Sequence, residues 1–386
     1  MTNLITQTSI TIEQSNTKYS GRTKKFTFNF VNTLTIVSSW ATLTDTLKLV
    51  FPKNIYFVDE RGKKVNWEGK NIIADKQDPL ILRGDKITVS LGYIYESSGS
   101  PVLQMNQEFT GYITKVVNRS PLQIEAEDNM YMLKQIKTPN KVFPSASYDL
   151  QKIMTELLKD TPFKVVSSTA DNTVSTSIGS FRTHNETVAQ VLERLRRDYH
   201  IESYFRGDEL RCSGIVYYPQ DCIKHTFKFQ ENIISDQLEY RRKDDVRIGV
   251  KAYSIHGEEQ SEYNVYGHKN YKQKRIETTV GDMDGEIRTL YFLDVPTVEQ
   301  LKIKAQERLN RLYYEGFHGS FTTFGLPSVK HGDATVLIDT MIPERQGTYL
   351  IKQVEKTMSK NNGFKQTITI DIRTDTLTQG EIQLGL

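Results

Sequence analysis

The chain has 386 residues, enough for two or three domains at about 100 to 200 residues per domain. Its 50 basic and 47 acidic residues leave a formal charge of only +3, which argues against binding nucleic acid or an acidic membrane through overall charge. The 20 tyrosines, 17 phenylalanines and 11 scattered prolines favour strands over long helices.

Two further features of the composition concern the compartment of the protein. The first residues, Met1 to Thr6, lack the basic start and apolar core of a signal peptide, and no segment has the length and hydrophobicity of a membrane span. We therefore expect a protein that is made and kept in a cytoplasm-like compartment. Cys212 and Cys222 are too few for a disulfide framework and lack the clustered histidines of a zinc site, so both are expected to be reduced and structural.

Residues 1–136 are predicted to form a first β domain. Apolar and polar side chains alternate at 26–30 and at 47–49, as on strands with one buried face. A short helical turn is expected within 38–45. The Gly84-Asp85 turn then opens another strand, and 92–110 is expected to be an inserted loop.

Residues 137–225 change to a helical period and predict a small α+β domain. Ser147 is the expected N-cap of a helix whose apolar stripe runs from Leu150 to Leu158. A second helix is expected to begin near Thr183, with Glu186 completing a capping box. The turn Arg206-Gly207-Asp208 should connect two strands of a hairpin.

Residues 226–373 return to strand alternation and predict a second β domain. The polar stretch 257–275 is expected to be a loop, and Asp284-Gly285 is expected to mark a hairpin. One clear helix is predicted at 297–315. The polar residues 374–386 are predicted to form a C-terminal arm.

The two β domains share a sequence pattern. Gly84-Asp85 and Gly332-Asp333 each open a strand, and Tyr112 and Tyr349 each begin a later strand with aliphatic residues, lysine and valine at similar offsets. Alternation common to any two antiparallel sheets is the alternative explanation, but the order of the shared residues favours a duplication. The duplication suggests a ring-forming protein, because two similar units per chain let a ring of low symmetry imitate one with twice as many members.

Motifs that would carry chemistry are weak, and we predict no catalytic, cofactor-binding or metal-binding residues and no cofactor. The residues 282–286 lack the ligand spacing of a calcium loop. Two Arg-Gly-Asp triplets are better explained as turns than as adhesion motifs. The basic run 241–243 is followed by two aspartates that neutralise its charge, so it is a poor candidate for binding the phosphates of a nucleic acid. The carboxylates Glu125, Glu127 and Asp128 are better explained as a solvated strand face than as a glycosidase pair. The histidines are dispersed with no pair at ligand spacing: His184, His200, His225, His256, His268, His318 and His331.

Several segments occur together in an order typical of one family: VSSWATLTDT at 37–46, LRGDKITV at 82–89, EFTGYI at 108–113, PLQIEAED at 121–128, and the helix and hairpin within 191–211. In these the chain resembles the tail hub proteins of phages and phage-derived injection systems. That family includes the baseplate hub of contractile-tailed phages, late-control protein D and the N-terminal part of the type VI secretion spike protein.

The resemblance implies a mainly β fold with an α/β insert, in which two tail-tube-like β-barrel domains are joined by a small α+β domain. It also implies a homotrimer whose six barrels form a ring, adapting a sixfold tail tube to a threefold spike at the baseplate or tail tip of a virion. The implied partners are a tail tube or tube-initiator protein, a separate spike or tail-tip protein, the tape measure protein and baseplate wedge proteins. DNA would pass through the lumen without specific binding. The alternatives are a β-rich adhesin or carbohydrate-binding module and, less favoured, a β-barrel hydrolase.

Overall fold

A computed structural model describes residues 4–15, 21–52, 56–59, 61–66, 80–97, 100–117, 121–144, 147–166, 178, 180–213, 222–242, 247–263, 269–293, 295–312 and 314–374. In chain order the elements are β1 (Ile5–Glu13), β2 (Lys25–Phe28), β3 (Thr33–Ser39), β4 (Thr46–Val50), β5 (Tyr56–Val58), β6 (Lys64–Asn66), β7 (Lys86–Ser97), β8 (Ser100–Val117), β9 (Gln123–Glu127), α1 (Met130–Leu133), β10 (Lys141–Phe143), α2 (Leu150–Leu158), β11 (Lys164–Val166), β12 (Phe181–Thr183), α3 (Val188–Tyr199), β13 (Glu202–Arg206), β14 (Glu209–Ser213), β15 (Lys224–Lys228), β16 (Ile233–Arg241), β17 (Ile248–Tyr263), β18 (Lys269–Gly281), β19 (Glu286–Leu293), α4 (Val298–Leu312), β20 (Gly316–Phe324), β21 (Ala334–Ile338), the 3-10 turn η2 (Pro343–Arg345), β22 (Gly347–Ser359) and β23 (Gly363–Arg373).

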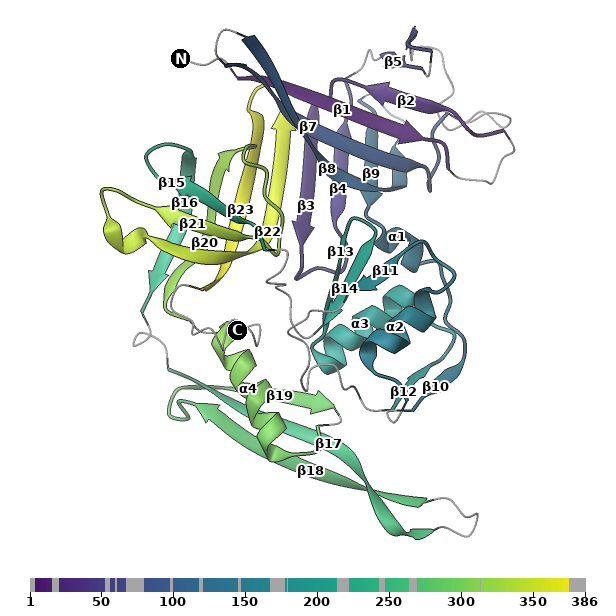
Figure 1. The fold of residues 1–386 in the computed structure, drawn as a ribbon, viewed down its shortest axis with the longest axis vertical. Coiled ribbons are helices and arrows are strands. Elements are labelled where there is room, and N and C mark those ends of the chain that lie inside the picture. Colours follow the sequence, from purple (N-terminus) through teal and green to yellow (C-terminus); the bar gives the residue numbers. More distant parts are fainter. Residues whose placement is uncertain are drawn as a thin grey trace.

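One 15-stranded sheet runs through the molecule and carries two β units (Figure 1). The first β unit comprises β1 to β9, and the second comprises β15, β16 and β20 to β23. Their strands follow the order β16-β20-β23-β22-β3-β4-β9-β8-β7-β1-β2-β5-β6, with β15 paired to β21 and β21 to β22. The two units meet where β22 pairs antiparallel with β3. The predicted fold class, mainly β with an α/β insert, is confirmed.

The α/β unit lies between the two β units in the chain and has a separate core formed by α2, α3 and small sheets (Figure 1). The predicted stripe on α2 is buried, from Leu150 to Leu158. Its N-cap is Asp149 and not Ser147, because the Asp149 carboxylate accepts the N–H of Lys152 at 2.8 Å.

The second helix begins later than predicted. Thr183 is fully buried on β12, where its hydroxyl donates to the carbonyl of Pro139 at 2.5 Å, so it cannot cap a helix. The capping box of α3 is formed by Thr187 and Gln190. Thr183 and Thr187 are each followed three residues later by a possible capping-box partner, Glu186 and Gln190. Because Thr183 is buried on β12, Thr187 is the residue that caps the helix.

Replacing Thr187 with alanine should destabilise the α/β unit by about 1 kcal/mol, because the N–H of Gln190 loses its acceptor. Urea denaturation should show a lower midpoint at unchanged slope. Serine at the same position is the matched control and should keep most of the stability. A loss as large with serine as with alanine would contradict a capping role.

An insert unit at 248–312 interrupts the second β unit between β16 and β20. It comprises the sheet β18-β17-β19 with α4 packed on one face, and Leu301 and Ala305 are fully buried in its core. In the stretch 257–275, predicted to be a loop, residues 257–263 and 269–275 instead extend the β17–β18 hairpin, with Gly257 opposite Gln273. The residues at Asp284-Gly285 do not form a hairpin turn, because β18 and β19 both pair with β17 and not with each other.

The sequence-predicted boundaries at 136, 225 and 373 remain predictions, and the core of the insert unit lies inside the predicted second β domain. In the first unit, residues 92–97 and 100–110 do not form a loop but belong to the long β7–β8 hairpin, in which Gly92 pairs with Met105. The short helical turn predicted within 38–45 is not a helix: residues 38 and 39 end β3, and 40–45 form a turn that is closed by the N–H of Ser39 donating to the Asp45 carboxylate at 3.0 Å. Of the arm predicted at 374–386, residues 375–386 lie outside the described residues.

Candidate functional site at the joint between the two β units

The Gly-Asp turn has the same backbone geometry in both β units. Gly84 and Gly332 have φ of +92° and +83°, a region that favours glycine. The N–H of Gly84 donates to the carbonyl of Ile113 at 2.7 Å, and that of Gly332 donates to Ile351 at 2.9 Å. In return the N–H of Ile113 donates to the backbone carbonyl of Asp85, and that of Ile351 donates to the backbone carbonyl of Asp333. The duplication predicted from the sequence is therefore present in the structure.

The structural alignment of the two copies corrects the sequence alignment by one residue. Each long strand has a register shift after the isoleucine, between Ile113 and Lys115 on β8 and between Ile351 and Gln353 on β22. Ile113 therefore corresponds to Ile351, and Tyr112 corresponds to Leu350 instead of Tyr349. A bulge at the same position in both copies is a stronger sign of duplication than the shared tyrosine.

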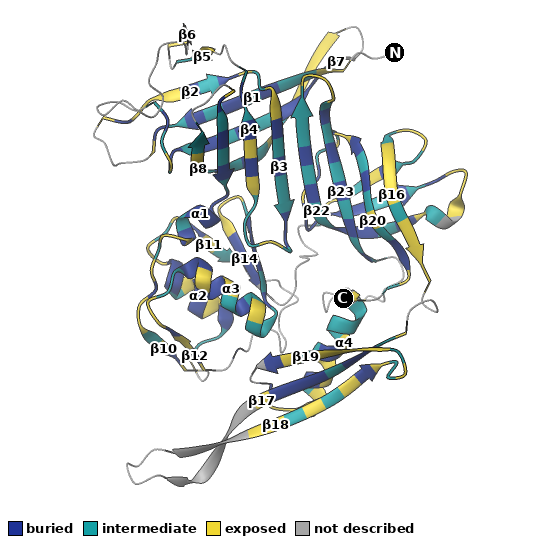
Figure 2. Ribbon diagram, turned by 180° about the vertical axis from the view of Figure 1, so that it is seen from behind, coloured by how far each residue is buried: buried dark blue, intermediate teal, exposed yellow. Residues whose placement is uncertain are grey.

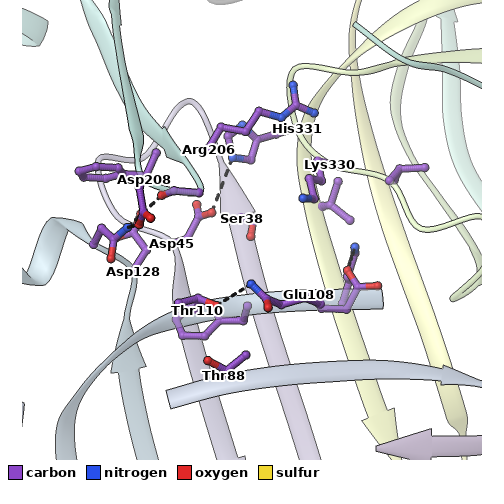
Figure 3. Close-up of a pocket in the computed structure, with 18 of the residues that line it drawn as sticks. Ser38, Asp45, Thr88, Glu108, Thr110, Asp128, Arg206, Asp208, Lys330 and His331 are labelled. Atoms are coloured by element: carbon purple, nitrogen blue, oxygen red, sulfur yellow. Dashed lines mark hydrogen bonds and ion pairs between the residues drawn. The ribbon is translucent and has the colours of Figure 1, made fainter. Parts of the chain in front are cut away.

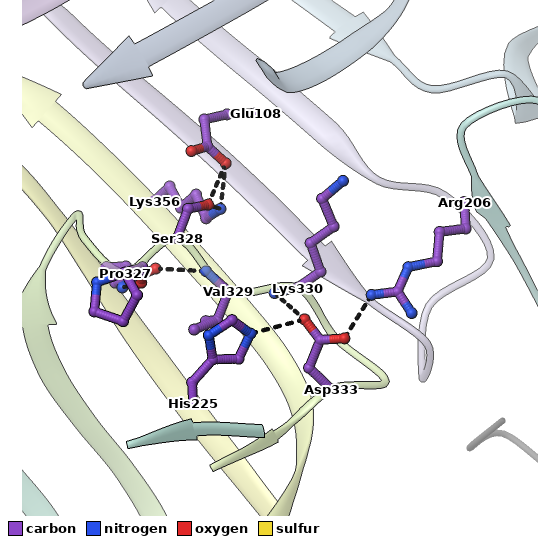
Figure 4. Close-up of polar contacts among 10 residues, drawn as sticks. Glu108, Arg206, His225, Pro327, Ser328, Val329, Lys330, Asp333 and Lys356 are labelled. Carbon is purple, nitrogen blue, oxygen red and sulfur yellow. Dashed lines mark hydrogen bonds and ion pairs between the residues drawn. The ribbon is translucent and has the colours of Figure 1, made fainter. Parts of the chain in front are cut away.

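A buried carboxylate closes the turn in each copy, but the arginine that pairs with it differs in origin. Asp85 pairs with Arg22 of its own unit, whereas Asp333 accepts from Arg206 of the α/β unit at 2.6 Å and from His225 at 3.3 Å (Figure 4). Burial acts to raise the pKa of Asp333, but the His225 hydrogen bond and the Arg206 charge hold it below its ordinary value. Its contribution to stability is therefore complete above about pH 4 and is lost as the pH falls further.

The β22–β3 pairing is the joint between the two β units. Seven residue pairs span it, from Gln353 opposite Ser39 to Ser359 opposite Thr33. The outer edge of β22 is occupied by β21 up to Leu350 and then by β3, while β23 covers the other edge. The joint is therefore a continuous sheet and not a contact between separate surfaces.

A buried ion pair crosses this joint. Lys356 of β22 pairs with Glu108 of β8, and their side chains are 5% and 0% exposed (Figure 4). Ser328 connects them, since its hydroxyl donates to Glu108 at 2.9 Å and accepts from Lys356 at 2.7 Å. Burial lowers the pKa of Lys356, while the Glu108 charge acts in the opposite direction. A buried pair of this kind fixes the relative position of the two units, because separating its members leaves a charge in an apolar interior.

Apolar packing continues across the same joint. Phe364 of the second unit lies in the core of the first and stacks on Tyr93 with ring centroids 5.7 Å apart. The Tyr93 hydroxyl donates to the carbonyl of Phe364 and accepts the N–H of Gly325 at 3.2 Å. The two β units therefore share part of one core.

A polar cavity of about 310 Å³ lies where both β units meet the α/β unit (Figure 3). Asp45, Asp128 and His331 project toward it, and His331 lies 3.6 Å from Asp45. Burial and the neighbouring charge of Asp45 raise the pKa of Asp128 well above its ordinary value. A cavity of this size and polarity can hold several water molecules, which would hydrate the charged groups. A carboxyl group with a raised pKa could also transfer a proton.

The motifs considered in the sequence do not converge on one site. Glu125 and Glu127 form ion pairs with Lys115 at 3.8 Å and Lys134 at 2.7 Å, and only Asp128 reaches the cavity. Asp85 is fully buried, so the first Arg-Gly-Asp triplet is a structural turn. The remaining candidates are at separate places: Asp282 and Asp284 bind Arg247, His318 stacks on Tyr314, Cys212 is buried and Cys222 is half-buried.

Within the ranges that the structure describes, no group of three histidine, cysteine, aspartate or glutamate side chains is placed to hold a metal ion. Among the helices of the same ranges, none is long and apolar enough to cross a membrane.

His200 connects the α/β unit to the insert unit, and its titration is expected to make their contact sensitive to pH. Its Nε2 lies 3.2 Å from the carbonyl of Tyr291, to which it donates, and its ring packs edge-on against Phe292. Burial, together with the positive charge of Arg308, lowers its pKa from 6.5 to about 4. Since a separated His200 would regain the higher pKa, docking of the two units should be strongest above pH 6.5 and weaken as the pH falls from 6.5 toward 4.

Hydrogen exchange of the β19 amides at pH 7 and pH 5, corrected for intrinsic rates, should show lower protection at pH 5. His200→Gln keeps a donor for Tyr291 but does not titrate, so it is the matched control and should remove this difference. Equal protection of the wild type at both pH values would contradict the prediction.

Comparison with known proteins gives no match by family model or by curated sequence, but clear matches in structure. A tail protein from Neisseria meningitidis MC58 matches with a TM-score of 0.60 and 14% identity, covering 99% of each chain. The 43 kDa tail protein of prophage MuSo2 from Shewanella oneidensis matches with a TM-score of 0.55 and 15% identity, covering 94% of this chain and 97% of that one. The chain has the tail-protein fold.

The tail-protein fold also extends to a chain of the Francisella PdpA-VgrG complex, which matches with a TM-score of 0.52 and 11% identity over 97% of this chain and 59% of that chain. At such identities the similarity concerns the fold and not individual residues. The sequence resemblance to tail hub proteins is confirmed at this level. Sequence reasoning missed the residues that build the joint in this tail-protein fold, because Glu108 and Lys356 are 248 positions apart.

Proposed function

We propose that the chain is a structural hub protein of a phage tail or a related injection apparatus. Three copies would form a ring of six β units, which adapts a sixfold tail tube to a threefold spike. The observation that carries the proposal is the β22–β3 joint, where two duplicated units pair side by side in one sheet. Two similar units per chain allow three chains to imitate six subunits.

The partners follow from this role. One face of the ring would bind a tail tube or tube-initiator protein, and the other a separate spike or tail-tip protein. The tape measure protein and baseplate wedge proteins are further candidates, and DNA would pass through the lumen without specific binding. The virion tail, assembled in the host cytoplasm, would be the location. The fold shared with phage tail proteins over almost the whole chain supports this assignment.

Sedimentation of the purified protein tests the ring directly. A species of three times the chain mass, with a central pore and six peripheral lobes in negative-stain images, is the expected result. A species that remains monomeric up to high micromolar concentration, with no rings in the images, would overturn the proposal.

A hydrolase is the rival that one observation favours, the raised pKa of Asp128 beside Asp45 in the cavity. We propose instead that the protein is not an enzyme and that the cavity holds structural water. Screening against glycoside and peptide substrates should show no turnover. Turnover that is lost in Asp128→Asn, with the fold preserved, would favour the hydrolase.

A further inference from the structure

Two equivalent strand edges, one on β22 and one on β8, differ in how much of their length is paired with another strand. In the second unit, the outer edge of β22 pairs first with β21 and then with β3. In the first unit, the equivalent edge of β8 pairs with β7 as far as Tyr112. Beyond the bulge, no described strand pairs with that edge at 115–117, although β9 covers the opposite edge. The first unit therefore has an open edge where the second unit has the joint.

The strand that fills the joint also has an open counterpart. Within each unit the order of equivalent strands is the same, β3-β4-β9-β8 in the first and β16-β20-β23-β22 in the second. β16 therefore corresponds to β3. In the described part of the chain β16 pairs only with β20, so its outer edge is open.

Residue equivalences follow from the pairing registers. Val116 is opposite Ile124 and Val354 is opposite Ile368, just after the bulge in each copy, so Val116 corresponds to Val354. On the next strand of each unit, Leu49 is opposite Ile124 and Phe321 is opposite Ile368. Leu34 is opposite Leu49 and Asp236 is opposite Phe321, so Leu34 corresponds to Asp236. Ser38 therefore corresponds to Tyr240, four residues further along each strand.

We propose that β16 of one copy pairs antiparallel with the open edge of β8 in a second copy of this chain, with Tyr240 opposite Val116. The template is the joint inside each chain, where Ser38 is opposite Val354. The same register places Glu239 opposite Val117 and Arg241 opposite Lys115. The inference rests on the proposed ring and specifies the contact that closes it.

The exposure of these strands is consistent with a missing partner. β16 is nine residues long, contains no proline and is exposed over most of its length, as its yellow colour at the outer edge in Figure 2 shows. Its apolar residues Ile234 and Tyr240 are 42% and 37% exposed. A long open edge with exposed apolar side chains tends to pair with another chain, so a specific partner strand would protect it.

The charges at the proposed contact balance. Arg241 would lie opposite Lys115, but Glu239 is diagonal to Lys115 and already pairs with Arg241 at 3.4 Å. Lys115 in turn lies 3.8 Å from Glu125. Two cations and two carboxylates would therefore share this face of the sheet, while Tyr240 and Val116 meet on the other face.

The contact is head-to-tail and can close a ring. Each β unit contributes one strand, β3 or β16, and one strand edge that such a strand can pair with, on β8 or β22. β3 pairs with β22 inside the chain, and β16 would pair with β8 of the next chain. Joints within a chain would alternate with joints between chains, and both would have the same strand direction and register. Repetition of such a heterologous contact gives a closed ring when the rotation per unit divides a full turn.

Disulfide trapping in the full-length chain tests the register. Val116→Cys with Tyr240→Cys places two thiols directly opposite, within disulfide reach, and mild oxidation should link most chains covalently to their neighbours. Val116→Cys with Leu238→Cys is two residues out of register, at a diagonal separation of about 7 to 8 Å, and should cross-link at least about tenfold less. The natural cysteines should react slowly, because Cys212 is buried and burial raises the pKa of Cys222 to about 11.

Ser38→Cys with Val354→Cys is the matched control, because it makes the equivalent link inside one chain and should consume thiols without raising the mass. Mixing the two single variants, Val116→Cys and Tyr240→Cys, should give linked dimers and so prove that the contact is between chains. A trimeric ring that shows no link, or that links equally well through Leu238→Cys, would overturn this register but leave the hub proposal intact. A protein that sediments as a monomer would overturn both.

Discussion

Glu108→Ala is expected to destabilise the protein by about 3 to 5 kcal/mol, because it leaves the Lys356 ammonium in a buried site without its carboxylate. Ser328 would remain as an acceptor, but a neutral hydroxyl cannot compensate a buried charge. The loss should be largest at the joint between the β units. Urea denaturation would measure the total loss, and hydrogen exchange of the β3 and β22 amides would locate it.

The double variant Glu108→Leu with Lys356→Met is the control for this experiment. It removes both charges and fills the space with apolar side chains of similar size, so most of the lost stability should return. A single variant that loses less than about 1 kcal/mol would show that water reaches Lys356 and that the pair does not hold the joint.

Asp85→Ala is expected to have an effect of similar size, about 3 to 5 kcal/mol, through a different mechanism. The substitution removes the carboxylate that pairs with Arg22, whose side chain is only 2% exposed. It also removes the acceptor of the N–H groups of Leu82 and Ser15, at 2.7 and 3.1 Å. The turn that starts β7 would lose its closure, and denaturation should show the loss.

The second copy supplies the matched comparison, Asp333→Ala. Its partner Arg206 is 18% exposed and can regain water more easily than Arg22, so this variant should lose about 1 to 2 kcal/mol less than Asp85→Ala. Equal losses in the two variants would contradict the idea that burial of the arginine sets the size of the effect.

Local signals in the sequence were sufficient for elements that bury one regular face. The apolar stripe on α2 and the Gly-Asp turns were predicted correctly, because each depends on a short stretch of chain. The hairpins at 92–110 and 257–275 were predicted as loops. Both are rich in polar residues, and even in 92–110, where Tyr93 and Phe109 are buried, the apolar residues do not alternate regularly, so the pattern by which half-buried strands are recognised is missing.

The site itself could be predicted only in part. The duplication was visible, but the tyrosine match misplaced its alignment, since a bulge shifts the strand by one residue and a pattern of residue types does not show bulges. The joint could not be predicted, because it depends on residues such as Glu108 and Lys356 that meet only through the tertiary fold.

Arg22 belongs to the first β unit itself, whereas Arg206 belongs to the α/β unit, so the two similar β units should respond differently to movement of the α/β unit. In the first β unit, Arg22 and Asp85 belong to the same unit, so displacement of the α/β unit does not act on their contact directly. In the second β unit, the guanidinium of Arg206 belongs to the α/β unit. Displacement of the α/β unit would therefore act directly on the Asp333 carboxylate and on the start of β21 (Figure 4). A force applied to the α/β unit would therefore act through an arginine on the Gly-Asp turn of the second unit, whereas the equivalent turn of the first unit has no such connection through Arg22.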